Sequence, residues 1–381
     1  MKLQHTSKNQ VTALPTVSGT DRILLNEEAF HGMISLERKR TERSQRPFLL
    51  MLVDVDGIQA SDNSSETLGK LLCALSLSIR ETDVNGWYKS GSVVGILFTE
   101  IGMDPQKSVV GAMLARVNGA LYSALTFEEF NRISISHHLF PEEWDHDVSH
   151  RPSHPSLYPD LARRDNGKRG FSIIKRVMDV IGSTIGLVLC APLFLAIAIA
   201  IRLTSEGPIF FRQQRVGRFG TPFVFLKFRS MHIDNDAQVH KQYVKQLIAG
   251  QVEPQPSNGD GQGVYKITND PRVTKVGAFL RRTSMDELPQ LWNVLKGEMS
   301  LVGPRPAIPY EVEAYQIWHR RRVLEAKPGI TGLWQVSGRS RVKFDDMVRL
   351  DVRYALVPSV WLDIKILLLT PRSVLLGDGA Y

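Results

Sequence analysis

The longest apolar stretch of the chain covers residues 177–203 and is interrupted in its middle by Pro192. Residues 180–201 carry no charge, and hydroxyl side chains occur among them only at Ser183 and Thr184. A helix needs about 20 such residues to cross the hydrocarbon core of a bilayer. The pattern therefore predicts a helical segment embedded in a membrane.

Basic residues flank this segment on both sides, whereas a helix that spans the bilayer has an excess of Lys and Arg on one flank only. They are Lys168, Arg169, Lys175 and Arg176 before it, and Arg202, Arg212, Arg215 and Arg218 after it. Pro192 also removes a backbone donor and kinks a helix. We therefore predict a re-entrant membrane helix hairpin over residues 177–203, which turns near Ala191-Pro192 and leaves by the face it entered. Two alternatives stay open: a single span with a proline kink, and a buried core helix, which would rarely stay apolar all round for so long.

The pattern before this segment predicts a flexible tail over residues 1–45, a domain over 46–150 and a linker over 151–170. The tail is polar and has no hydrophobic core of a secretory signal. Periodicity in the domain predicts a strand, a helix, a hairpin, a helix and a strand at residues 48–55, 66–82, 87–99, 108–125 and 133–138. This is the βαββαβ order of ferredoxin-like folds. With residues 171–381 as a second domain, the expected fold class is α/β (α+β).

The formal net charge of +8 is unevenly distributed along the chain. Residues 46–150 contain 7 Lys/Arg against 14 Asp/Glu, whereas residues 168–230 contain 10 against 2. The positive charge therefore surrounds the apolar segment, where it would face anionic lipid head groups or phosphorylated ligands. No recognisable nucleic-acid-binding motif accompanies it, so we expect no nucleic-acid partner. Cys73 and Cys190 lie in unrelated segments, which is typical of a reducing, cytosol-facing protein.

The candidate chemistry lies in residues 281–306, where two arginines precede Asp286 and Glu287. Ser284 with Glu287 three residues later is a capping-box pattern; if Asp286 caps instead, Pro289 takes the third helical position. The two carboxylates would then favour the positive end of a helix dipole, which is a structural role. A functional role is also consistent with the pattern, because helix N-termini and arginines bind phosphates. Neighbouring carboxylates on a helix point about 100° apart, so one can attack phosphorus while the other holds Mg²⁺.

With these motifs in order, the chain resembles the bacterial sugar transferase family, the monotopic phosphoglycosyl transferases of polysaccharide synthesis. The resemblance covers about residues 171–381, and the ordered set is far more specific than any one motif. The motifs are Lys175-Arg176-Val177-Met178-Asp179, Phe211 with Arg215-Val216-Gly217, Lys227-Phe228-Arg229-Ser230-Met231, Asp286-Glu287-Leu288-Pro289-Gln290, Gly303-Pro304-Arg305-Pro306, Lys327-Pro328-Gly329-Ile330-Thr331-Gly332-Leu333-Trp334-Gln335 and Gly379-Ala380-Tyr381.

The resemblance implies transfer of a sugar-1-phosphate from a UDP-sugar, with a UDP-hexose favoured, to undecaprenyl phosphate, which releases UMP. This is the first membrane step of exopolysaccharide, capsule or O-antigen synthesis, at the cytoplasmic face of the bacterial inner membrane. By position, Asp286 would be the nucleophile that forms a covalent phosphosugar intermediate, and Glu287 with Asp286 would bind Mg²⁺. Arg281 and Arg305 would contact phosphates. A homodimer and polysaccharide-assembly proteins are left open as further partners.

Lys227 and Arg229 alternate with Phe225 and Phe228 in a predicted strand. This alternation is consistent with a solvated strand face as well as with a phosphate-binding role. Lys227 and Arg229 are therefore candidate phosphate-binding residues.

Residues 46–150 resemble a degenerate diguanylate-cyclase (GGDEF-type) domain through Asp54-Val55-Asp56-Gly57 and Gly86-Trp87-Tyr88. The acidic pair of the cyclase signature is missing, because Ser90-Gly91-Ser92-Val93-Val94 stands in its place. Asp54 and Asp56 can equally be turn formers at a strand end. An alternative function for the chain is therefore a nucleotide-sensing regulator or a scaffold with an inactive transferase-like membrane anchor.

Overall fold

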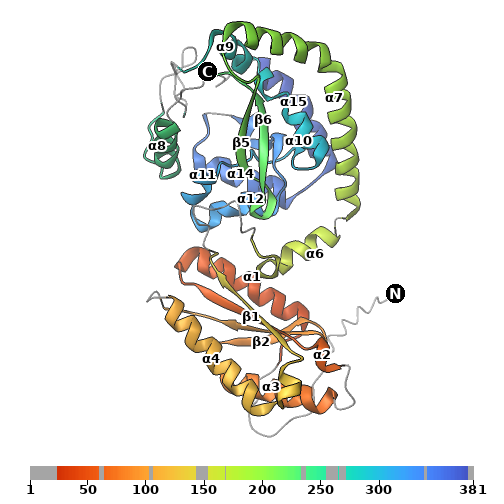
Figure 1. Cartoon of the computed structure of the whole chain (residues 1–381), viewed down its shortest axis with the longest axis vertical. Helices are drawn as coiled ribbons and strands as arrows, with labels where there is room; N and C mark the ends of the chain where they lie inside the picture. Colours follow the sequence, from red (N-terminus) through yellow and green to blue (C-terminus); the bar gives the residue numbers. More distant parts are fainter. Residues whose placement is uncertain are drawn as a thin grey trace, which may run out of the picture. The chain divides into compact units, whose positions relative to one another are not determined.

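The computed structural model describes residues 24–59, 64–102, 106–142, 153–167, 169–232, 237–254, 265, 272–338 and 341–375. The chain divides into two compact units (Figure 1). The first contains residues 1–142 with 155–160, and the second contains residues 143–154 with 161–381. The protein mixes helices and sheets, as the sequence predicts.

The first unit is built on a four-stranded antiparallel sheet with the strand order β2-β3-β1-β4. Its main elements are α1 (Glu27–Ser44), β1 (Phe48–Asp54), α3 (Ser64–Ser78), β2 (Val84–Lys89), β3 (Val93–Phe98), α4 (Gln106–Ala124) and β4 (Ser134–Phe140), with the short α2 (Asp56–Gln59), α5 (Phe127–Phe130) and η1 (Pro155–Leu157). The predicted succession of strand, helix, hairpin, helix and strand is thus confirmed. Alternate residues of β1, among them Leu49, Met51 and Val53, join residues of α3 and α4 in the core.

The prediction of a flexible tail is wrong for residues 24–45, because α1 lies within them. Asn26 caps this helix by accepting a hydrogen bond from the Ala29 backbone N–H at 2.8 Å. Phe30 and Ile34 are fully buried. The paired strand residues Gly86 and Gly95 leave room for the Phe30 ring, since a Cβ atom at Gly95 would lie 2.2 Å from it. One fully buried apolar pair at i, i+4 spacing therefore anchors a helix whose other residues are mostly polar. Residues 1–23 lie outside the described residues.

The second unit combines many helices with two small sheets. An antiparallel pair joins β5 (Phe210–Val216) to β6 (Pro222–Phe228), and a short parallel pair joins β7 (Ser300–Val302) to β8 (Gly329–Thr331). The helices are α6 (Pro159–Gly167), which links the units, α7 (Arg169–Thr204), η2 (Arg218–Gly220), α8 (Ala237–Ile248), α9 (Lys275–Arg282), η3 (Met285–Glu287), α10 (Gln290–Lys296), α11 (Pro309–Glu313), η4 (Ile317–Arg320), α12 (Arg321–Glu325), α13 (Leu333–Ser337), α14 (Phe344–Leu356) and α15 (Val360–Leu375).

The apolar segment lies in one continuous helix of 36 residues, α7, which bends along its length (Figure 1). It is long and apolar enough to cross a membrane, and only 11% of its most apolar window is buried. The predicted interruption at Ala191-Pro192 is wrong, because Pro192 lies inside the helix. Proline fits helical backbone angles and removes one hydrogen bond, so it bends a helix without ending it. The alternative of a buried core helix is also wrong, since Val188 is 68% exposed and Leu189 72%.

Both halves of α7 pack against other elements of the second unit. In the first half, the buried Asp179 accepts hydrogen bonds from the Ser300 hydroxyl at 2.9 Å and the Leu301 backbone N–H at 2.8 Å. In the second half, Ile197 and Ile201 pack with Phe228 of β6 and Leu280 of α9. The exposed apolar side chains of α7 lie between and around these contacts.

Two of the basic residues before the apolar segment point into the protein rather than toward lipid head groups. The Lys175 ammonium lies 2.7 Å from the buried Asp363 carboxylate of α15. The Arg176 guanidinium donates to the backbone carbonyls of Val294 and Leu295 at 2.8 Å, which satisfies the last turn of α10. The charge count around the helix therefore overestimates the charge available to a membrane.

Candidate active site

Asp286 and Glu287 lie in η3, a single 3₁₀ turn between α9 and α10. The turn begins at Ser284, whose φ of 55° is in the left-handed region. The predicted capping box is wrong, because neither Ser284 nor Pro289 makes a side-chain cap hydrogen bond. Apolar contacts hold the turn instead, since its neighbours Met285 and Leu288 pack in the cluster that also contains Leu193 and Phe194 of α7. The turn that carries the two carboxylates is thus flanked by residues that share an apolar cluster with α7, β6 and α9.

Lys227 of β6 binds both carboxylates. Its ammonium lies 2.8 Å from Glu287 Oε1 and 3.4 Å from Asp286 Oδ2. The side chains of Lys227, Asp286 and Glu287 are only 16%, 8% and 23% exposed. The interpretation of Lys227 as part of a solvated strand face is therefore wrong. One cation instead compensates two adjacent carboxylates in a site with little water.

The surroundings shift the pKa values of the two carboxyl groups in opposite directions. Burial raises the pKa of Asp286 above its usual value, and the attraction of Lys227 only partly offsets this. Burial also acts to raise the pKa of Glu287, but the charges of Lys227, Arg305 and Arg215 outweigh it and lower that pKa to about 2. Glu287 is therefore a carboxylate at neutral pH, whereas burial and the charge of Lys227 act on the pKa of Asp286 in opposite directions.

Two of the predicted phosphate-binding arginines lie beside the carboxylates. Arg281, in the last turn of α9, donates from Nε to the Ser230 hydroxyl at 3.0 Å, and its charge acts on Asp286. The exposed Arg305 acts on Glu287. Both cations are thus close to where a phosphate would meet the acidic pair.

Arg229 differs from these two residues. It is buried, and its Nη2 donates at 2.8 Å to the carbonyl and the hydroxyl of Ser205, directly after α7. Within the described part of the chain, Arg229 makes no hydrogen bond or ion pair with Asp286 or Glu287. Arg229 follows the end of β6, and its side chain holds the free carbonyls at the end of a helix. The structure thus separates Arg229 from Lys227, although the sequence pattern grouped them.

Sequence reasoning placed Arg215 of β5 among the flanking charges and in a family motif but gave it no role at the site. Its guanidinium is 5% exposed and donates from Nη1 to the Pro306 carbonyl at 2.9 Å. The guanidinium carbon lies 5.0 Å from the centre of the Phe225 ring, and the Lys227 ammonium lies 5.6 Å from that same centre. The register of the strand pair places Arg215 opposite Phe223, and the available sequence signal was the motif Arg215-Val216-Gly217.

A bound Mg²⁺ ion commonly uses one or two protein carboxylates and completes its shell with water and substrate phosphates. Asp286 and Glu287 supply such a pair. The described residues contain no group of three or more His, Cys, Asp or Glu side chains that could hold a metal ion by themselves. The donor set therefore fits an ion that is held partly by substrate.

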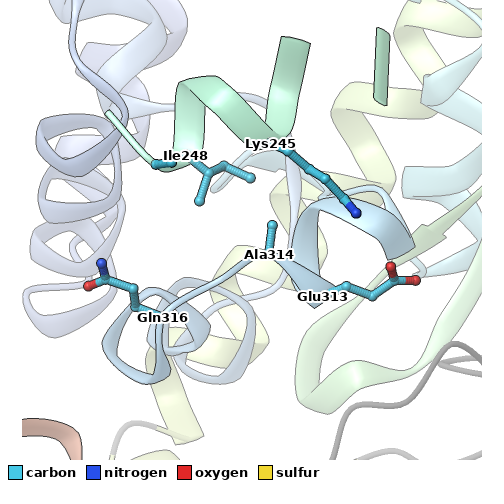
Figure 2. Close-up of a pocket in the computed structure, with 6 residues that line it drawn as sticks. Lys245, Ile248, Glu313, Ala314 and Gln316 are labelled. Carbon is cyan, nitrogen blue, oxygen red and sulfur yellow. The ribbon is translucent and has the colours of Figure 1, made fainter. Parts of the chain in front are cut away.

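A cavity of about 430 Å³ lies away from these residues, between α8 and the segment after α11 (Figure 2). Ile248 and Ala314 give it an apolar part, and Lys245, Glu313 and Gln316 are its polar lining. It contains none of the predicted site residues, so the acidic pair remains the candidate site.

Comparisons with known proteins match the second unit. The sequence model of the bacterial sugar transferases covers residues 171–377. The galactosyl transferase CpsE of Streptococcus agalactiae is 47% identical over 209 residues, which are 55% of this chain and 43% of that protein. The UDP-glucose:undecaprenyl-phosphate glucose-1-phosphate transferase of Escherichia coli is 39% identical over 55% of this chain and 42% of its own length. The exopolysaccharide production protein ExoY of Rhizobium meliloti is 38% identical over 54% of this chain and 88% of its own length.

The chain thus spans less than half the length of the first two of these relatives. Among solved structures, a diguanylate cyclase protein from Thermotoga maritima matches 32% of this chain and 84% of its own at 20% identity and a TM-score of 0.27. A similarity this low carries no argument about the first unit, and its likeness to GGDEF-type domains stays a prediction.

Proposed function

Because this chain belongs to the bacterial sugar transferase family, we propose that it transfers a sugar-1-phosphate from a UDP-hexose to undecaprenyl phosphate. The observation that carries the proposal is the pair of adjacent carboxylates, Asp286 and Glu287, bridged by Lys227 beside an exposed apolar helix. A soluble nucleotide sugar and a lipid phosphate can both reach such a site. The intact acidic pair also argues against an inactive membrane anchor.

The reaction proceeds in two displacements at one phosphorus atom. A carboxylate oxygen of Asp286 attacks the phosphorus that carries the sugar, and the bond to the oxygen that bridges to UMP breaks. UMP leaves with that bond's electron pair, and an aspartyl phosphosugar remains. An oxygen of undecaprenyl phosphate then attacks the same phosphorus and displaces the Asp286 carboxylate, which gives undecaprenyl diphosphate sugar.

The surrounding cations prepare Asp286 and the phosphates for these steps. Lys227 lowers the pKa of Asp286 against the effect of burial and so favours the carboxylate form, and Arg281 and Arg305 attract the phosphate oxygens. Glu287, a carboxylate with a pKa of about 2, together with Asp286 would hold Mg²⁺. When bound, this ion neutralises phosphate oxygens and the leaving group.

The proposed activity is tested by measuring release of UMP from a panel of UDP-hexoses by the full chain in detergent. We expect release that requires undecaprenyl phosphate for multiple turnovers and that stops when EDTA removes Mg²⁺. Without the lipid, a single equivalent of UMP per site is expected, because the first displacement needs only the donor. Release that is indifferent to both the lipid and Mg²⁺ would contradict the proposal.

We further propose that α7 is re-entrant and that the active site lies at the cytoplasmic face of the inner membrane. The support is that one unit contacts both halves of α7, through Asp179 in the first half and Ile197 in the second. A helix with its ends on opposite sides of the bilayer would carry these contacts through the hydrocarbon, where polar backbone groups cannot be satisfied. The bend in α7, which contains Pro192, is consistent with a helix that returns to the same face.

Single cysteines at the two ends of α7 test this topology. Gly170 and Glu206 are exposed, and a Cβ atom at Gly170 meets no neighbour. In a Cys73→Ser, Cys190→Ser background, we expect Gly170→Cys and Glu206→Cys to react with a membrane-impermeant maleimide only in inside-out vesicles. Reaction of the two cysteines from opposite sides would show that α7 spans the membrane.

For the first unit, we propose a ferredoxin-like fold of the GGDEF type that has lost its catalytic signature. The antiparallel order β2-β3-β1-β4 and the two helical crossovers support this proposal. The β2–β3 turn is occupied by a contact within the unit, since Ser90 donates from its backbone N–H and its hydroxyl to Glu27 of α1.

A further inference from the structure

The loop that carries Arg305 is held by two buried guanidinium groups that bind consecutive backbone carbonyls. Arg322 of α12 donates from Nη2 to the carbonyl of Arg305 at 3.2 Å. Arg215 of β5 donates from Nη1 to the carbonyl of the next residue, Pro306, at 2.9 Å. The neighbouring backbone is tied as well, because Val216 N–H donates to the Ala307 carbonyl at 2.9 Å. The only exposed side chain in this short segment is Arg305.

The two guanidinium groups differ in how their charges are compensated. Arg322 forms a buried ion pair with Asp351 at 2.8 Å and donates to the Tyr315 hydroxyl at 3.1 Å. Arg215 has no carboxylate within ion-pair distance among the described residues, and its Nε is buried without a hydrogen-bond partner. The carboxylates of Glu311 and Glu287 act on its charge only from beyond ion-pair distance, and burial of a guanidinium without a direct partner is costly. The Phe225 ring and one loop carbonyl are the contacts that hold Arg215 in place.

We propose that Arg215 is a positioning residue, which holds the backbone of the Arg305 loop so that the Arg305 side chain stays beside Glu287. This inference rests on the proposed function. Prolines on both sides of Arg305 fix the backbone angles there. The hydrogen bond from Arg215 to the Pro306 carbonyl therefore sets the direction of the Arg305 side chain. Arg215 contacts the loop and Phe225 and has no need to touch substrate.

A double-mutant cycle tests this proposal. Arg215→Met and Arg305→Met are each expected to lower kcat about 10- to 100-fold, because a misplacement of about 1 Å costs that much. If Arg215 acts through Arg305, the double variant is no slower than Arg305→Met alone. Arg215→Lys, which keeps one donor for the Pro306 carbonyl, should recover part of the rate. Losses that multiply in the double variant would overturn the proposal.

Arg176→Met is the matched control, since Arg176 also binds two backbone carbonyls but in the last turn of α10. Its loss should multiply with that of Arg305→Met. The same cycle is run on the dissociation constant for UDP, which needs no turnover, so it remains decisive if the wild-type chain releases no UMP. Equal and non-additive weakening of UDP binding supports the positioning role, and additive weakening contradicts it. Thermal unfolding of each variant identifies any that fail to fold.

Discussion

Asp286→Asn is expected to reduce UMP release about 1,000-fold or more, because a neutral amide is a poor nucleophile and cannot form the acyl phosphate that the first displacement requires. Asparagine has the same shape as aspartate. The substitution removes a buried carboxyl group whose pKa is raised by burial. The variant should therefore remain folded. The rate is measured as UMP release, and intact-protein mass spectrometry follows the phosphosugar adduct, which should be absent from the variant.

The matched control is Asp346→Asn, since this aspartate of α14 is 52% exposed and pairs only with the exposed Arg349. We expect its turnover and adduct to equal those of the wild type. Full turnover by Asp286→Asn would show that Asp286 is not the nucleophile, and an adduct on Asp286→Asn would place the covalent step on another residue.

Lys227→Met is expected to reduce both activity and stability. The rate should fall about 100-fold or more, because a preorganised cation at the reacting phosphate is lost. The free energy of unfolding should fall by about 3 kcal/mol at neutral pH, since two largely buried carboxylates lose their shared partner. Methionine nearly matches the length of lysine, so the loss reports the charge rather than the volume.

The stability difference between Lys227→Met and the wild type should depend on pH. The pKa of Glu287 in the folded protein, about 2, lies below the usual 4.5. Its contribution to stability is therefore present above about pH 4.5 and is lost as the pH falls toward 2. Lys227 also lowers the pKa of Asp286, so removing Lys227 matters least when both carboxyl groups are protonated. Denaturant unfolding between pH 3 and pH 8 should show the gap closing toward acid.

Lys296→Met is the control for this series, because Lys296 is 51% exposed and its partner Glu298 lies 4.0 Å away. It should change stability by less than about 1 kcal/mol at any pH. A gap between Lys227→Met and the wild type that stays constant down to pH 3 would show that Lys227 stabilises the protein by packing and not by charge.

The helix over the apolar segment and the strand and helix order of the first unit followed from local patterns. The same patterns gave wrong predictions where a few contacts between residues distant in the chain determine the structure. Phe30 and Ile34 anchor α1 in a segment whose overall polarity indicated a tail. The chain was expected to turn between two helical segments near Ala191-Pro192, but one helix continues through Pro192. In both places the local signal is weaker than the packing that overrides it.

Part of the candidate site could likewise be predicted from the sequence, and part could not. Asp286 and Glu287 are adjacent in the chain, so the sequence alone could identify them, and ordered motifs identified Lys227, Arg281 and Arg305. Three arginines that each lie in a family motif then receive different tasks from the fold. Arg305 is exposed beside Glu287, Arg229 binds the end of α7, and Arg215 binds the Arg305 loop.

The sequence by itself determined the apolar segment, the element order of the first unit and the adjacent acidic pair, because each depends on residues near one another in the chain. Only the tertiary structure decided which charges face inward. Lys227 meets its carboxylates across 59 and 60 residues, and Arg215 meets the Pro306 carbonyl across 91. Hydrophobic periodicity records which face of an element is buried, but not the partner that a buried cation will find, because that partner is set by how the elements pack.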